Sequence, residues 1–204
     1  MSRIMSAKNN KPAVISKDKA VQKAKATAFG LSPAAYPDIS RDTEMPQESL
    51  TDFNLSLFQK LIDYRFNDEL ILRRALTRLA YAKENSLPEN DYMDAYATLG
   101  DAVIDVVVIE RLVIVNKDHD KGVITTKKTD LVNMTRLRNL ASGLGLQNYV
   151  LWGKGEKHQH IWTSGRVLAE SVEAICGAMY LDGGIDAVRE FLDKTGFFCP
   201  KNMQ

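Results

Sequence analysis

Residues 101–116 place the strongest constraint on the fold of this chain. The segment contains no glycine or proline, and most of its residues are valine or isoleucine. By propensity alone, such β-branched residues favour a strand. The segment is longer than the roughly four to eight residues of an ordinary strand, and an unbroken apolar run of this length favours a buried helix. We therefore predict a buried helix, and with it an all-α fold.

Glycines and polar clusters divide the rest of the chain into further helical segments. From Asn54 onward the apolar side chains recur on one helix face, and the dipeptide Gly183-Gly184 interrupts the C-terminal pattern. Residues 152–165 are polar and contain glycine and histidine, so they are predicted to form a loop. The sequence predicts further helices over residues 125–144, 166–181 and 185–195.

Residues 1–50 differ from the rest of the chain in composition. They are rich in lysine, serine, alanine and proline and contain few large apolar side chains, so burial cannot offset the entropy lost on ordering them. We predict a disordered basic tail over residues 1–50 and a single domain over residues 51–204. Residues 1–27 hold seven lysines and arginines against one aspartate, whereas the formal net charge of the whole chain is only +1. This basic stretch is either a flexible arm for nucleic-acid phosphates or a solvated terminus without a role.

The cysteine content and the hydropathy pattern exclude several classes of protein. The chain has 2 cysteines, Cys176 and Cys199, which form neither a metal-binding pattern nor a disulfide framework. A reducing, cytoplasmic setting is therefore expected. No signal peptide and no membrane-spanning segment is expected, because no apolar run is long enough. The sequence contains no phosphate-binding loop and no catalytic triad, and no organic cofactor is expected.

Acidic residues occur in two apolar helical segments in which a core helix would carry none. Asp101 and Asp105 are four residues apart in the first segment, and Glu170 and Glu173 are three residues apart in the second, so each pair shares one helix face. Buried carboxylates are costly unless they are paired or bind a metal ion. Two such helices together would form an oxygen-ligand site suited to Mg²⁺. Alternatively, these acids are half-exposed and pair with Arg166, Arg111 or a nearby lysine.

Five sequence blocks identify a resemblance to a known family. They are residues 75–81 (ALTRLAY), 94–103 (DAYATLGDAV), 122–133 (GVITTKKTDLVN), 153–156 (GKGE) and 170–184 (ESVEAICGAMYLDGG). Their order and content resemble the catalytic domain of ribonuclease III over residues 55–197. A block such as LGDA is weak alone, whereas five blocks in order are specific. The resemblance implies the helical ribonuclease III fold.

The resemblance also implies a set of site residues, with one departure. Asp101 and Glu173 match two of the family's four metal-site acids and are the candidate catalytic residues. Glu170, the third candidate metal ligand, stands where the family usually has aspartate. Ala97 stands where the family usually has glutamate. Asp94 matches a further acid of the signature block and is a possible supporting residue.

The implied activity is endonucleolytic cleavage of double-stranded RNA, in the processing of rRNA or other structured precursors. Mg²⁺ would be the metal, with Mn²⁺ as a possible substitute, and Lys128 could contact a phosphate. The products would carry 5′-phosphate and 3′-hydroxyl ends. The family's domain is a homodimer, and its dimer interface is built partly from the signature helix. We therefore expect the apolar face of this helix to serve self-association in this chain, through Val103, Ile104, Val107 and Val108.

Ala97 keeps an alternative open. The small Mini-III branch of the family has a similar signature with alanine, lacks a double-stranded-RNA-binding domain, as we expect of this chain, and is an enzyme. Other ribonuclease III-like domains have lost catalysis and persist as RNA-binding or ribosome-associated proteins. The resemblance to Mini-III is only partial, because the GKGE and LDGG blocks look more like ordinary ribonuclease III.

Overall fold

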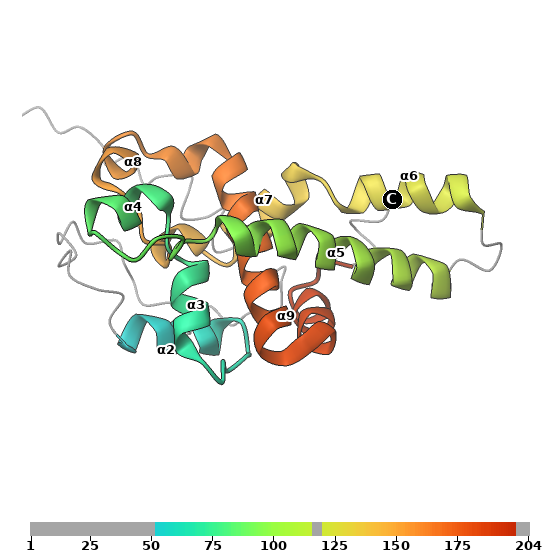
Figure 1. Cartoon of the computed structure of the whole chain (residues 1–204). Coiled ribbons are helices and arrows are strands. Elements are labelled where there is room, and N and C mark those ends of the chain that lie inside the picture. The colour runs from blue at the N-terminus through green and yellow to red at the C-terminus, as the bar shows by residue number, and fades with distance from the viewer. Residues whose placement is uncertain (1–51, 116–119, 199–204) are drawn as a thin grey trace, which may run out of the picture. The chain divides into compact units, whose positions relative to one another are not determined.

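A computed structural model of the chain describes residues 52–115 and 120–198 (Figure 1). These residues are helical and contain no strand, only one isolated β-bridge between Thr77 and Leu151. The all-α prediction is therefore confirmed. The predicted tail, residues 1–50, lies outside the described residues. The α-helices are α2 (Asp52–Leu61), α3 (Glu69–Ala75), α4 (Leu79–Glu84), α5 (Asp94–Val115), α6 (Lys121–Leu131), α7 (Met134–Gly143), α8 (Lys154–His158) and α9 (Arg166–Lys194), with short 3₁₀ turns at η2 (Leu146–Asn148) and η3 (Ile161–Ser164).

Helices α5 and α9 form the centre of the described fold (Figure 1). The apolar run at 101–115 is helical, as predicted from its length. One face of α5 is buried in the core, and it carries Val103, Ile104, Val107 and Val108. The expectation that these four residues serve self-association is therefore wrong, because the chain's own core already covers them. The opposite face of α5 is exposed.

Helix α9 changes direction at Gly184, as the Gly183-Gly184 pair predicted. Gly184 has φ 76° and ψ −173°, a conformation that side chains other than glycine rarely adopt. The first part of α9 carries Glu170 and Glu173 and is otherwise mostly buried. The second part of α9 also belongs to the core, because Val188, Phe191 and Leu192 are buried there.

Two sequence predictions need correction. The helix predicted over residues 125–144 is divided into α6 and α7, because Asn133 leaves the helical conformation and its side chain accepts a hydrogen bond from the backbone of Arg136. The loop predicted over residues 152–165 contains the short helices α8 and η3. Trp152 is buried in the core of the domain, and Trp162 packs against it with ring centroids 5.5 Å apart.

Among the described residues, no helix combines the length and the apolar character that crossing a membrane would need.

Candidate active site

The two helices that carry the candidate acids touch through glycine. A β-carbon added to Gly100 of α5 would lie 1.7 Å from the backbone oxygen of Glu173 in α9. A β-carbon added to Gly177 would lie 2.1 Å from the backbone oxygen of Tyr96. Only glycine fits at either position, so the backbones approach as closely as they can. This contact places Asp101, the residue after Gly100, beside Glu173.

Glu173 is half-buried and surrounded by negative charge. Burial is the largest cause that raises the pKa of Glu173 from 4.5 to about 7; repulsion from Asp101 and Glu170 adds to it, and attraction by Arg166 opposes it. The three predicted acids are therefore close enough to interact electrostatically. Ionising Glu173 next to other carboxylates is costly, and a bound cation would remove this cost. The carboxylate oxygens of these acids therefore fit a hard divalent ion.

Glu170 differs from the other two acids because both of its oxygens are engaged by arginine. Oε1 accepts a hydrogen bond from Nε of Arg166 at 3.0 Å, and Oε2 lies 3.4 Å from Nη1 of Arg78. Within residues 52–115 and 120–198, no three His, Cys, Asp or Glu side chains are placed to hold one metal ion together. The structure thus brings the predicted acids near one another but turns Glu170 toward cationic side chains.

Arg78 is the residue of this site that the sequence did not reveal. It precedes α4, and its side chain is only 15% exposed. Nε and Nη2 both donate to Oε1 of Glu156, at 3.1 and 3.0 Å, while Nη1 reaches Glu170. In the sequence, Arg78 is marked only by its place in the matched block 75–81. Its partners Glu156 and Glu170 lie too far along the chain for a local pattern to indicate the contact.

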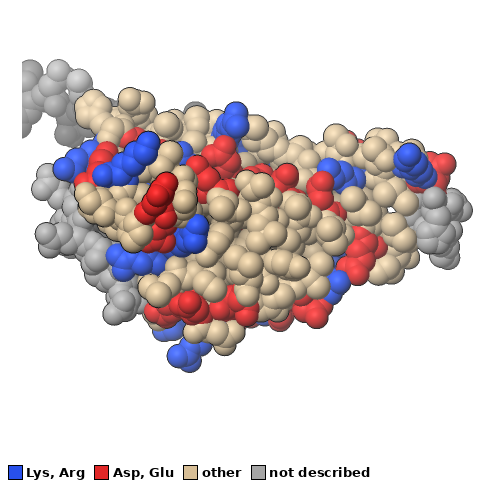
Figure 2. Space-filling model, viewed as in Figure 1, with Lys and Arg blue, Asp and Glu red and all other residues tan. Residues whose placement is uncertain are grey.

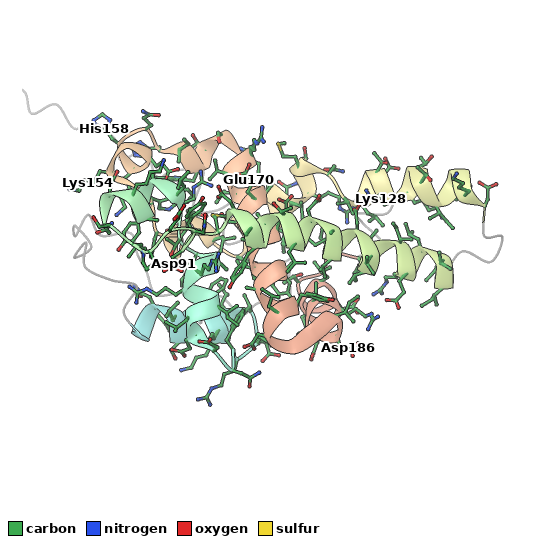
Figure 3. The ribbon with its side chains drawn as sticks, viewed as in Figure 1. Asp91, Lys128, Lys154, His158, Glu170 and Asp186 are labelled. Carbon is green, nitrogen blue, oxygen red and sulfur yellow. The ribbon has the colours of Figure 1, made fainter. Side chains whose placement is uncertain are left out.

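The GKGE block forms the start of α8 and is held by α4 and by Arg78. The backbone nitrogen of Lys154 donates to both carboxylate oxygens of Glu84, at 3.0 and 2.9 Å. Glu156 accepts from the backbone nitrogen of Gly153 at 3.1 Å through the oxygen that Arg78 does not use. These bonds fix Lys154 at the surface, on the side of Glu170 opposite to Lys128 (Figure 3).

The two possible supporting residues lie in different settings. Asp94 is exposed in the first turn of α5, one turn before Ala97, which packs against the core. Lys128 on α6 forms an ion pair with Asp105 on α5, with 2.6 Å between Nζ and Oδ2. Its ammonium group therefore joins two helices, and Asp105 takes part in this pair. A role in phosphate contact stays a prediction for Lys128, as does a supporting role for Asp94.

A family model described as "Ribonuclease-III-like" matches residues 68–197 of the chain. The curated relatives include "Ribonuclease 3" of Syntrophobacter fumaroxidans, which is 35% identical over 69% of this chain and 58% of its own length. "Ribonuclease 3" of Oleidesulfovibrio alaskensis is 40% identical over 64% of this chain and 58% of its own length. The chain thus spans less than two thirds of the length of these relatives.

Solved structures show the same fold. The nuclease domain of ribonuclease III from Campylobacter jejuni superposes with a TM-score of 0.63 at 26% identity. The match covers 70% of this chain and 96% of that domain. The Campylobacter jejuni domain is described as structurally flexible in the region involved in dimer formation.

Proposed function

This chain belongs to the ribonuclease-III-like family, and on that premise we propose that it is an endoribonuclease that cleaves double-stranded RNA by Mg²⁺-dependent hydrolysis. The observation that carries the proposal is the juxtaposition of Asp101 and Glu173 across the glycine contact of α5 and α9. The proposal extends to a cytoplasmic protein that processes rRNA or other structured precursors.

The donor set supports Mg²⁺ at Asp101 and Glu173. Carboxylate oxygens are the ligands that Mg²⁺ prefers, and it is commonly bound through one or two carboxylates while it keeps several waters. When bound, the ion would activate water and stabilise negative charge on the attacked phosphate. Asp101 and Glu173 would hold the ion at the helix contact, and Glu170, the third predicted acid, would lie nearby with its oxygens paired to Arg78 and Arg166. Mn²⁺ can replace Mg²⁺ at such oxygen sites.

Cationic side chains near these acids support an RNA substrate. Arg166 is 75% exposed beside Glu170, and Lys154 is exposed on α8. Figure 2 shows lysine and arginine side chains gathered over α4 and α8, mixed with acidic ones. Such side chains contact phosphates without reading base sequence, which fits recognition of duplex RNA by shape.

The exposed face of α5 supports a homodimer. Val106, Ile109 and Val113 are exposed large apolar residues spaced by three and four, so they form one stripe along the helix. Figure 2 shows an uncharged surface over the middle of α5. An exposed apolar stripe of this kind marks an interaction surface, and a second copy of the chain would cover it. This stripe, rather than the buried face with Val103, is the proposed contact.

A cleavage assay on a long perfect RNA duplex tests the proposed activity. With Mg²⁺ or Mn²⁺ we expect products with 5′-phosphate and 3′-hydroxyl ends, and none when a chelator is added. Ala97 favours a second function, that of a non-catalytic RNA-binding protein, because it removes one acid of the family's usual set. Duplex binding without cleavage under any metal condition would establish that second function.

A further inference from the structure

The Glu170 carboxylate sits between two arginines of very different exposure. Arg166 is 75% exposed and lies one turn before Glu170 on the same helix. An exposed pair of this kind contributes little to stability, because water screens it. Arg78 is only 15% exposed and approaches the other carboxylate oxygen from a different element. Arg78 is therefore the partner that can hold Glu170 in place.

Arg78 is itself fixed by several contacts. Two of its nitrogens donate to Oε1 of Glu156, whose side chain is 12% exposed. Its backbone nitrogen donates to the carbonyl of Leu151 at 3.2 Å, and Nη1 lies 3.8 Å from the sulfur of Met93. A guanidinium held at this many points cannot follow Glu170 if that carboxylate turns toward Asp101 and Glu173. The Glu170 carboxylate can therefore contact either Arg78 or a cation held by Asp101 and Glu173, but not both at once.

We propose that Arg78 is a positioning residue that competes with the divalent cation for Glu170 and so withholds this carboxylate from the metal site. The inference rests on the proposed metal site at Asp101 and Glu173. It accounts for two observations together: the three acids interact electrostatically, and yet no three of the described ligand side chains are placed to share an ion. The chain then binds its cation through two carboxylates, although its sequence supplies three.

The test measures Mn²⁺ binding to RNA-free protein by titration calorimetry, independently of any cleavage. Removing Arg78 alone would leave the mostly buried Glu156 carboxylate without its ion-pair partner, which is destabilising. The variant is therefore Arg78→Gln with Glu156→Gln, which removes both charges and leaves the net charge unchanged. Thermal melting checks that it folds. Arg166→Gln is the matched control, because it removes the exposed arginine from the same carboxylate.

The double variant should bind Mn²⁺ more tightly than the parent, on the order of tenfold, because it frees a carboxylate beside the ion. Arg166→Gln should change the affinity by about twofold or less. Adding Glu170→Gln to the double variant should return the affinity to that of the parent. A purely structural role for Arg78 predicts weaker binding instead.

Equal or weaker Mn²⁺ binding by a folded double variant would overturn the inference. Tighter binding that persists with Glu170→Gln would overturn it too, because Glu170 would then not be the ligand released. If the parent binds Mn²⁺ and cleaves duplex RNA, either result leaves the proposed function intact. A parent and a double variant that both fail to bind Mn²⁺ would refute the metal site and this inference together.

Discussion

Gly100 and the backbone oxygen of Glu173 are in direct contact, so closely that a β-carbon on Gly100 would lie 1.7 Å from that oxygen. The same contact sets the distance between Asp101 and Glu173. The glycine of the LGDA block is therefore as much a part of the site as the aspartate that follows it. Gly100 therefore determines both the packing of α5 against α9 and the closeness of the two acids.

Gly100→Ala should lower the free energy of unfolding by about 3 kcal/mol, the upper range for inserting a methyl group into a packed contact. Urea denaturation measures the change. Gly155→Ala is the matched control, because an added β-carbon there meets nothing within 4 Å. A replacement of glycine in a helix by alanine without a clash should be neutral or stabilising. Equal stability of the two variants would disprove the close contact at Gly100.

The metal-free protein should lose stability as the pH rises from about 4.5 to about 7. Burial and the neighbouring acids raise the pKa of Glu173 from its ordinary 4.5 to about 7. The folded state therefore holds this proton more tightly than the unfolded chain, and its advantage is lost as the proton leaves. Glu173→Gln should remove this part of the pH dependence, whereas Glu89→Gln in the exposed loop after α4 should not. Denaturation at pH 5 and pH 8 provides the comparison, and identical pH profiles of parent and Glu173→Gln would contradict it.

Asp101→Asn and Glu173→Gln should each reduce cleavage on the order of 1,000-fold or more, because each removes a ligand charge with little change in volume. Both variants should keep the fold and the dimer, as checked by melting and light scattering. Glu170→Gln should retain more activity, because its carboxylate is already paired with Arg78 and Arg166. Full activity of either of the first two variants would rule out the proposed mechanism.

Val106→Asp should shift the protein from dimer to monomer, because it places a charge in the middle of the exposed α5 stripe. Leu70→Asp is the control, since Leu70 is more exposed than Val106 but lies on α3, away from the stripe. Light scattering across a concentration series reports the molecular mass. A parent that stays monomeric, or a Val106→Asp variant that stays dimeric, would argue against the stripe as the contact.

The sequence predicted the all-α fold and the pair of acidic segments, but not every helix boundary and not how the helices pack. Helix α5 has valine or isoleucine on both faces, so periodicity could not show that Val107 is buried and Val106 exposed. The break at Asn133 arises because its side chain caps the start of α7, whereas the sequence is also compatible with one continuous helix. The block match located Asp101, Glu170 and Glu173, whereas the Arg78–Glu170 pair joins residues too far apart for a local pattern to indicate.

Ala97 provides the most direct test of the central claim, that this chain hydrolyses duplex RNA with its reduced set of acids. Ala97 and Asp101 are one turn apart on α5, so Ala97→Glu places a further carboxylate on the same face. The measurement is cleavage of a long perfect RNA duplex as a function of Mg²⁺ concentration, for the parent and for Ala97→Glu. We predict that both proteins cleave and that Ala97→Glu reaches half-maximal cleavage at a lower Mg²⁺ concentration. If both proteins bind the duplex and neither cleaves it at any Mg²⁺ or Mn²⁺ concentration, the chain is an RNA-binding protein and not an enzyme.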